Sequence, residues 1–145
     1  MAEVIAKAKL PSCLMHNRET MDYNNFLEDV VSDLQETLNI AKKSRNFQRI
    51  PLYSILVLVL PKNYEQNLAI TNHLEVLDTL GCPVLLGTSR KSMIGLTLDL
   101  PSDQREEGTM VTTVWAVQKG CMFVRVHNVQ ANVRAIKMAE ALLRN

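Results

Sequence analysis

The chain has 145 residues, of which 47% are hydrophobic and 21% are charged, and its formal net charge is +1. This composition is typical of a folded globular domain and excludes a disordered chain, and the near-neutral balance gives no overall field that would attract nucleic acid or an acidic membrane. The length suits one domain with a core of its own, so we predict a single domain over residues 1–145.

Three cysteines, Cys13, Cys82 and Cys121, are spread widely along the chain. An odd number at this spacing matches neither a disulfide framework nor a zinc motif, and it favours a reducing compartment. The N-terminal residues lack the apolar core of a signal peptide, and the longest apolar run, residues 55–60, is too short to span a bilayer. We therefore expect a cytoplasmic protein without a membrane segment.

The apolar pattern of the first half predicts an alternation of strands and helices. Residues 10–16 are a short apolar run that predicts a strand, and residues 24–43 carry apolar side chains at helical spacing. Residues 54–60 form an unbroken apolar run, which is typical of a strand covered on both faces. Residues 64–80 again predict a helix, and Gly81 is placed to cap its C-terminus.

The second half continues this alternation. Residues 83–87 predict a third strand, residues 109–119 a helix that ends at Gly120, and residues 121–127 a fourth strand. The acidic stretch at residues 102–107 is interpreted as the solvated start of a helix. A last helix is expected to bury one apolar stripe, made of Val129, Val133, Ile136, Ala139 and Leu143. Four strand–helix units in a row predict an α/β fold with a parallel sheet and right-handed crossovers.

Polar and charged residues gather where the predicted strands end. In parallel strand–helix repeats the C-terminal ends of the strands meet at one rim, and functional groups lie there. The residues at or just after these ends are His16, Ser89, Arg90, Lys91, Arg125 and His127. Several hydrogen-bond donors on one rim favour an anion such as phosphate or pyrophosphate. The cysteines lie near strand starts instead, and we interpret them as packing residues.

Several of the notable residues also have a plainer interpretation. Arg125 and His127 lie two apart on one strand and share a face, where an ordinary salt bridge at the rim would explain them equally well. His73 lies among polar residues of a predicted helix and is expected to face solvent. Trp115 and the methionines, apart from Met15, are interpreted as packing residues.

Four segments resemble motifs of bacterial dihydropteroate synthase. Residues 87–95, Gly-Thr-Ser-Arg-Lys-Ser-Met-Ile-Gly, resemble the motif on the seventh strand of that family's barrel, and residues 125–129, Arg-Val-His-Asn-Val, resemble the motif on its eighth strand. Residues 14–17 are similar to the end of the fifth strand, and residues 65–68 to the segment entering the helix after the sixth. Order and spacing agree along nearly the whole chain.

The resemblance implies a fold, a reaction and a set of site residues. The fold is part of a (β/α)₈ TIM barrel, about four strand–helix units. The reaction condenses a dihydropterin pyrophosphate with p-aminobenzoate in folate synthesis, a step that sulfonamides target, and it uses Mg²⁺ that acts through the pyrophosphate. By motif position, the implied substrate-binding residues are Met15, Gly87, Ser89, Lys91, Ser92, Arg125 and His127.

The resemblance also implies a role for individual residues. Lys91 contacts the pterin and lies beside the p-aminobenzoate, and Ser92 binds the p-aminobenzoate carboxylate. Arg125 and His127 hold the pyrophosphate and stabilise its charge as it leaves, so that these two residues and Lys91 are the implied catalytic set. Met15 belongs to the wall of the pterin pocket.

The sequence departs from the family pattern in two ways. Nothing in it corresponds to the first four strands, and residues 54–64 lack the Asp-Pro-Gly motif that ends the sixth strand, although Lys62 is placed like the lysine that follows it. A half-barrel exposes two sheet edges, so we expect a homo-oligomer or a complementing half-barrel as partner. The alternative to an enzyme is a non-catalytic remnant or interaction module that keeps an anion site on Lys91, Arg125 and His127.

Overall fold

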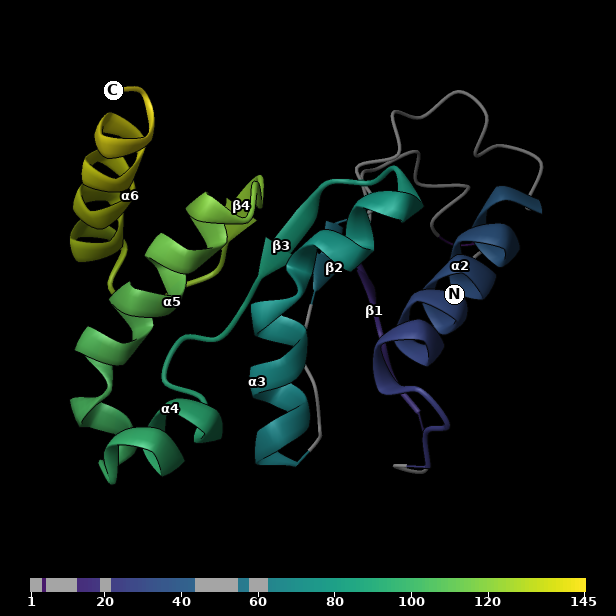
Figure 1. The fold of residues 1–145 in the computed structure, drawn as a ribbon, viewed down its shortest axis with the longest axis horizontal. Coiled ribbons are helices and arrows are strands. Elements are labelled where there is room, and N and C mark those ends of the chain that lie inside the picture. The colour runs from purple at the N-terminus through teal and green to yellow at the C-terminus, as the bar shows by residue number, and fades with distance from the viewer. Residues whose placement is uncertain (1–3, 5–12, 19–21, 44–54, 58–62) are drawn as a thin grey trace.

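The computed structural model describes residue 4 and residues 13–18, 22–43, 55–57 and 63–145 (Figure 1). In chain order the elements are β1 (Cys13–Met15), α2 (Phe26–Lys43), β2 (Ile55–Val57), α3 (Tyr64–Asn72), the 3₁₀-helix η2 (Leu74–Leu80), β3 (Val84–Leu86), α4 (Ser92–Leu98), the 3₁₀-helix η3 (Ser102–Gln104), α5 (Glu106–Gln118), β4 (Phe123–Val124) and α6 (Val129–Leu143). Parts of two predicted strands, residues 10–12, 54 and 58–60, lie outside the described residues, and so does Lys62.

The strands form a four-stranded sheet in the order β1-β2-β3-β4, and every neighbouring pair is parallel. Met15 pairs with Val57, Val57 with Leu85, and Leu85 with Phe123, so one register row crosses all the strands. The elements follow chain order across the molecule, from α2 beside β1 at one end to α6 beyond β4 at the other (Figure 1). The predicted α/β fold with parallel strands is confirmed.

Helices cover one face of this sheet and form the core with it. Leu14, Val84 and Leu86 alternate with less buried neighbours along their strands, as expected when one face is covered. They join a cluster of buried residues from the helices, namely Val30, Leu34, Leu38, Ile70, Leu74, Leu77, Leu80 and Ala116. On the register row of the other face, Met15 is 48% exposed and Phe123 is 37% exposed.

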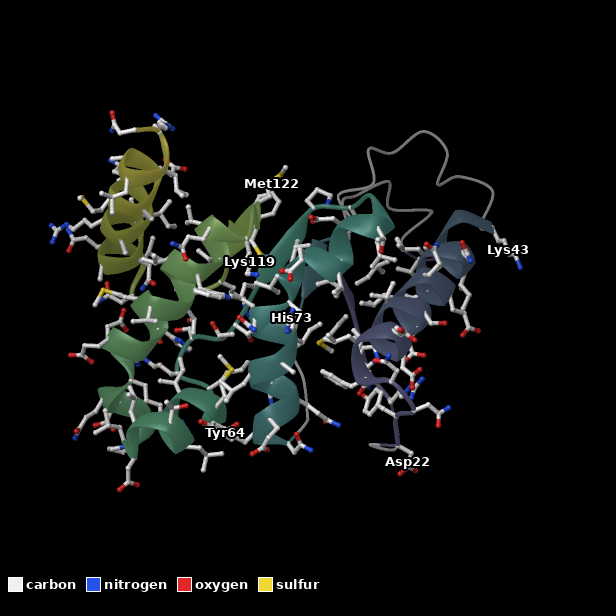
Figure 2. All side chains as sticks on the ribbon, in the orientation of Figure 1. Asp22, Lys43, Tyr64, His73, Lys119 and Met122 are labelled. Carbon is white, nitrogen blue, oxygen red and sulfur yellow. The ribbon has the colours of Figure 1, made fainter. Side chains whose placement is uncertain are left out.

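The helix predicted over residues 64–80 divides at His73. There the backbone leaves helical geometry, with φ −114° and ψ 41°, and the chain continues as η2. A 3₁₀-helix places every third residue on one face, which matches the buried spacing of Leu74, Leu77 and Leu80. Gly81 ends the segment with φ 62°, so its predicted capping role is confirmed. His73 is exposed as predicted, and Figure 2 labels it.

Helix α4 is absent from the sequence-based prediction. It is only seven residues long, it contains Gly95, and no side chain caps its start at Lys91, so the usual start signals of a helix are missing. Helix α5 begins at Glu106, earlier than residue 109, and η3 precedes it. The acidic stretch is therefore a helix start, as predicted.

The predicted burial along α6 is wrong for most of its stripe. Val129 is 62% exposed, Val133 is 42% exposed and Leu143 is 58% exposed, and only Ala139 of the five is buried. Helix α6 packs against α5, and the hydroxyl of Thr113 donates to Oδ1 of Asn132 at 2.6 Å. Ile136 and Leu143 line a pocket together with Phe123 and Val124 of β4, so they are not packed into the core. Among the helices that the structure describes, none has both the length and the apolar character needed to cross a membrane.

Two further packing predictions hold only in part. Met93 is buried, but Met122, labelled in Figure 2, is 61% exposed and Met138 is 59% exposed. Cys82 and Cys121 pack against the core, and burial raises the pKa of Cys121 to about 11, with a further contribution from Asp78. Such a thiol stays protonated and inert. Cys13 is exposed at the start of β1, so its predicted packing role is wrong.

Candidate functional site

The turn between β3 and α4 carries most of the predicted site residues. Thr88 and Ser89 are buried just after the strand, and the amide of Lys91 donates to the carbonyl oxygen of Thr88 at 3.0 Å. Arg90 adopts φ 58°, in the left-handed region that residues other than glycine rarely enter. This sharp turn lets Lys91 start α4, and Ser92 is the exposed first residue of that helix.

Ser89 joins this turn to the end of the neighbouring strand. Its Oγ lies 2.9 Å from Nδ1 of His127, and the backbone amide of His127 donates to the same Oγ at 3.3 Å. Two bonds to one buried hydroxyl fix the imidazole relative to the backbone. Within the described chain Nε2 of His127 has no hydrogen-bond partner, so it is available to a ligand.

Gly87 and Arg125 meet at the same rim. The amide of Arg125 donates to the carbonyl oxygen of Leu86 at 2.9 Å, which continues the pairing of β3 and β4 past their assigned ends. A Cβ atom at Gly87 would lie 3.6 Å from Nε of Arg125 and 3.9 Å from Nη2. The guanidinium therefore lies against the bare backbone of Gly87, where a longer side chain would compete for its place.

Lys91 and Arg125 form a pair of like charges. Burial lowers the pKa of Lys91 below its usual range, and the positive charge of Arg125 lowers it further. Neither side chain takes part in a salt bridge with any residue that the structure describes. A bound anion would stabilise the positive charge of Lys91 in the presence of the nearby Arg125.

Arg90 does not belong to this pair, although the sequence places it between Ser89 and Lys91. Its Nη2 lies 3.8 Å from Oε2 of Glu106 at the start of α5, and its amide donates to Oγ1 of Thr109 at 3.1 Å. The left-handed turn thus directs one cation toward α5 and leaves the next one for the rim. Of the cations at the strand ends, Arg90 is therefore directed to Glu106 rather than left open at the rim.

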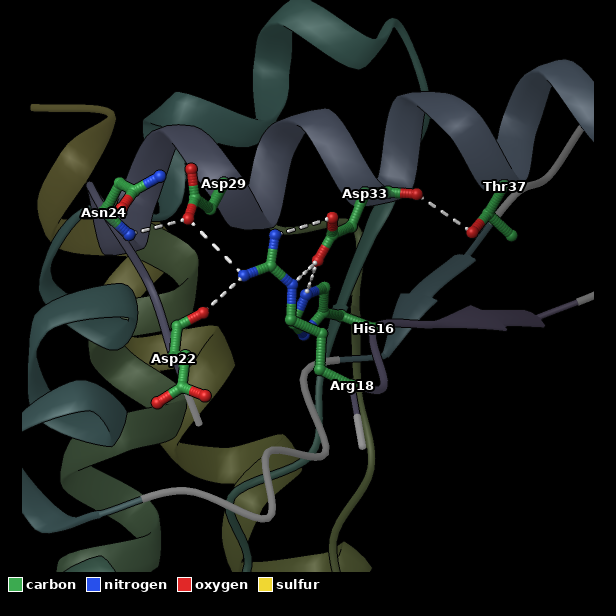
Figure 3. Close-up of polar contacts among 7 residues, drawn as sticks. All are labelled: His16, Arg18, Asp22, Asn24, Asp29, Asp33 and Thr37. Carbon is green, nitrogen blue, oxygen red and sulfur yellow. Dashed lines mark hydrogen bonds and ion pairs between the residues drawn. The ribbon is translucent and has the colours of Figure 1, made fainter. Parts of the chain in front are cut away.

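The end of β1 contributes a different arrangement (Figure 3). His16 is buried, and its Nε2 lies 2.7 Å from Oδ2 of Asp33 on α2. Arg18 donates to both carboxylate oxygens of Asp33, at 2.7 Å and 3.0 Å, and lies 3.4 Å from Asp29. Burial by itself raises the pKa of Asp33, but the hydrogen bonds from Arg18 and His16 outweigh it and lower that pKa.

This arrangement changes the interpretation of the β1 end. His16 lies at a strand end as predicted, but its imidazole bonds to a carboxylate of α2 instead of joining the cations near β3 and β4. The sequence prediction missed Arg18, Asp29 and Asp33. The only available signal was the spacing of the two acids, four apart on one helix. Met15, two residues after Cys13, is exposed on the uncovered face of the sheet.

The described side chains do not fit direct binding of a divalent metal. In the described ranges, no three side chains of His, Cys, Asp or Glu are grouped so that they could hold an ion. The rim instead presents a lysine, an arginine, an imidazole and hydroxyl groups, and the first two repel a cation. What this rim can do chemically is bind and neutralise negative charge.

Comparison with known proteins by sequence gives a consistent result. A family model described as "Pterin binding enzyme" matches residues 1–127. The chain is 50% identical over 149 residues to a dihydropteroate synthase of Clostridium beijerinckii, an alignment that covers 99% of this chain and 54% of that protein. It is 44% identical to the dihydropteroate synthase of Bacillus subtilis, with 99% of this chain and 50% of that protein covered.

Solved structures agree with these relatives. A dihydropteroate synthase from Clostridium difficile, determined in the presence of pteroic acid, matches with a TM-score of 0.90 and 34% identity over 100% of this chain and 55% of that chain. The Yersinia pestis enzyme with a pterine-sulfa conjugate matches with a TM-score of 0.88 and 30% identity, over 99% and 56% of the two chains. The chain spans about half the length of the curated relatives it matches.

Proposed function

Because the chain belongs to the family of pterin-binding enzymes that includes the dihydropteroate synthases, we propose that it serves dihydropteroate synthesis. In this reaction a dihydropterin pyrophosphate condenses with p-aminobenzoate, and pyrophosphate leaves. One observation carries the proposal. Lys91 and Arg125 are two neighbouring cations that no described acid neutralises, beside a histidine with one ring nitrogen open to a ligand.

We assign Arg125 and His127 to the pyrophosphate. Negative charge grows on the leaving group as its C–O bond breaks, and donors already fixed in place stabilise that charge at little reorganisation cost. The bond from Ser89 supports such a role for His127, and the space at Gly87 supports it for Arg125. Ser89 and Gly87 thereby act as substrate-site residues through the groups that they position.

The other assignments concern the pterin and the p-aminobenzoate. Lys91 contacts the pterin and stands beside p-aminobenzoate, and Ser92 binds the carboxylate of p-aminobenzoate. The exposed start of α4 at Ser92 supports this, because backbone N–H groups at a helix start are open to an anion. Met15 forms part of the pterin wall, in keeping with its exposure on the uncovered face.

Magnesium enters this proposal only as a companion of the pyrophosphate. Among the described residues, no three side chains of His, Cys, Asp or Glu are grouped so that they could hold it, and no step is assigned to protein-bound metal. The odd number of cysteines supports a reducing compartment, and we place the protein in the cytosol on that ground. Sulfonamides, which resemble p-aminobenzoate, are expected to compete at Lys91 and Ser92.

The architecture belongs to the same proposal. We infer that residues 1–145 are one domain and that its strands are about four of the eight strands of a (β/α)₈ barrel. The exposure of Met15 and Phe123 on one face of the sheet, and of Val133 and Leu143 on α6, supports further partners at these surfaces. We propose that a second copy or a complementing half-barrel is such a partner. Light scattering after size exclusion tests the homo-oligomer.

Calorimetric titration tests the proposed site directly. Wild-type protein is titrated with dihydropterin pyrophosphate and with pyrophosphate alone, and both are expected to bind. Arg125→Ala is expected to lose at least about tenfold in affinity, because one charge-assisted contact is worth about 1.5–3 kcal/mol. Arg134→Ala, an exposed arginine of α6, is the matched control and is expected to bind as wild type does.

A non-catalytic module is the second candidate function. The missing Asp-Pro-Gly motif in residues 54–64 favours it, although most of that segment lies outside the described residues. Binding of both ligands without turnover would support the module. Turnover, alone or with a complementing half-barrel, would support the enzyme, and absence of binding by wild type would contradict both.

A further inference from the structure

The arginine just before α5 reaches back to the turn that carries the site. Nη1 of Arg105 donates to the carbonyl oxygen of Arg90 at 3.1 Å and to that of Lys91 at 3.3 Å. Its Nε donates to the carbonyl oxygen of Leu100 at 2.8 Å. The guanidinium thus links the backbone before α4 to the backbone after it. No carboxylate among the described residues forms a salt bridge with it.

Gly95 provides the space in which this guanidinium lies. The residue is buried within α4, and a Cβ atom placed on it would overlap the guanidinium of Arg105. Helix interiors prefer alanine to glycine, so a glycine here has a cost that needs a reason. The close approach of Arg105 is that reason.

Thr109 holds the same turn from the amide side. Its side chain is fully buried. Its Oγ1 accepts from the amide of Arg90 at 3.1 Å and donates to the carbonyl oxygen of Arg105 at 2.8 Å. The amide of Lys91 is in turn bonded to Thr88. Both peptide groups around Arg90 are therefore fixed, and this maintains its left-handed φ of 58°.

We propose that Arg105 is a positioning residue for the site: it fixes the carbonyls of Arg90 and Lys91 and thereby sets the direction in which the Lys91 ammonium and the Ser92 hydroxyl leave the turn. The guanidinium acts through the backbone. That this direction serves ligand binding rests on the proposed function, whereas the fixing of the turn by Arg105 does not depend on any ligand. The two parts are tested separately.

Hydrogen exchange tests the fixing without any ligand. In Arg105→Met the side chain keeps its apolar stem and loses its donors, and the amides of residues 90–95 are expected to exchange at least about tenfold faster. Arg105→Lys keeps the charge and is expected to restore part of the protection. Arg134→Met is the matched control and should leave these amides unchanged. Equal protection in wild type and Arg105→Met would overturn the proposal.

Gly95→Ala displaces the same guanidinium without removing it. Alanine strengthens the intrinsic preference for helix, so faster exchange at residues 90–95 in this variant is not explained by a weaker α4. The same acceleration as in Arg105→Met is expected. If Arg105→Met fails to fold, the exchange rates of Gly95→Ala still test whether the guanidinium fixes the turn. Unchanged protection in Gly95→Ala would overturn the proposal.

Pyrophosphate titration and NMR titration of the Lys91 amine test the positioning. Arg105→Met is expected to weaken pyrophosphate binding about tenfold and to raise the pKa of Lys91 toward its ordinary value, with partial restoration in Arg105→Lys. If wild type binds no pyrophosphate, the proposed function fails, and the exchange and pKa results still decide the role of Arg105. If wild type binds and Arg105→Met matches it in affinity and in the pKa of Lys91, the positioning role fails.

Discussion

The imidazole of His127 is held by Ser89, a residue of the adjacent strand end, through a contact of 2.9 Å between Oγ and Nδ1. The same hydroxyl accepts the amide of His127, so side chain and backbone are fixed together. The orientation of a residue after β4 therefore depends on the turn after β3. A change in the turn after β3 should therefore also affect the ligand-facing nitrogen of His127.

Ser89→Ala is expected to weaken pyrophosphate binding about threefold to tenfold, because a hydrogen bond of this kind contributes about 0.5–1.5 kcal/mol. The side chain of His127 should also become mobile, which its NMR tautomer and line width report. Ser32→Ala, on an exposed serine of α2, serves as the control and should change neither quantity. An unchanged affinity in Ser89→Ala would show that the contact does not serve the ligand.

The lowered pKa of Lys91 predicts a pH dependence of anion binding. Burial and the charge of Arg125 both favour the neutral amine, so Lys91 loses its proton at a lower pH than an ordinary lysine. Pyrophosphate affinity should therefore fall as the pH rises through that lowered pKa, before the pH reaches about 10.4, where an ordinary lysine titrates, and calorimetry follows the fall. Lys91→Arg, which stays charged in this range, should show no such fall. A wild-type curve that is as flat as that of Lys91→Arg would contradict the assignment.

Asp33 is expected to stabilise the N-terminal part of the fold. Its pKa is lowered in the folded state, so its contribution is present above the unfolded pKa and is lost as the pH falls through the folded one. Stability should decline on acidification below about pH 4. Asp33→Asn should cost about 1–3 kcal/mol at neutral pH in urea unfolding, since Arg18 and His16 lose a charged partner. Glu36→Gln, on the exposed side of α2, should cost almost nothing.

Lys119 and Glu75 link α5 to η2 at the surface. The hydrogen bond from Lys119 is the largest cause that lowers the pKa of Glu75 to about 2, and His73 adds to this effect (Figure 2 labels His73 and Lys119). Lys119→Met should return that pKa toward the ordinary range, as followed by NMR of the carboxyl carbon. Because the pair is exposed, the loss of stability should be only about 0.2–1 kcal/mol. A pKa that stays at about 2 would show that Lys119 is not its cause.

Local patterns in the sequence were sufficient for most of the fold. The β-strands were predicted from short apolar runs, and Gly81 from its place after a helical pattern. Helix α4 is not predicted because its start and capping signals are weak. The division at His73 is not predicted because apolar residues three apart fit both an α-helix and a 3₁₀-helix over a short stretch. The exposure of Val129, Val133 and Leu143 on α6 could not be predicted from the helix itself, because an apolar stripe is the usual sign of burial.

The site was predictable to the extent that its residues lie at strand ends. Parallel strands bring Ser89, Arg125 and His127 to one rim, and the structure joins Ser89 to His127 as neighbours. Sequence alone could not separate Arg90 from Lys91, because a left-handed turn between them decides which cation reaches the rim. It also could not pair His16 with Asp33, since that bond joins two elements 17 residues apart.

The closeness of Gly95 and Arg105 makes these two positions interdependent. A methyl group at 95 is harmful only while a guanidinium occupies the same space, and it becomes tolerable once residue 105 is short. The energetic cost of the double substitution should therefore be smaller than the sum of the two single costs, a non-additivity that a double-mutant cycle measures. The residue types that position 95 tolerates are therefore decided by Arg105, ten residues further along the chain.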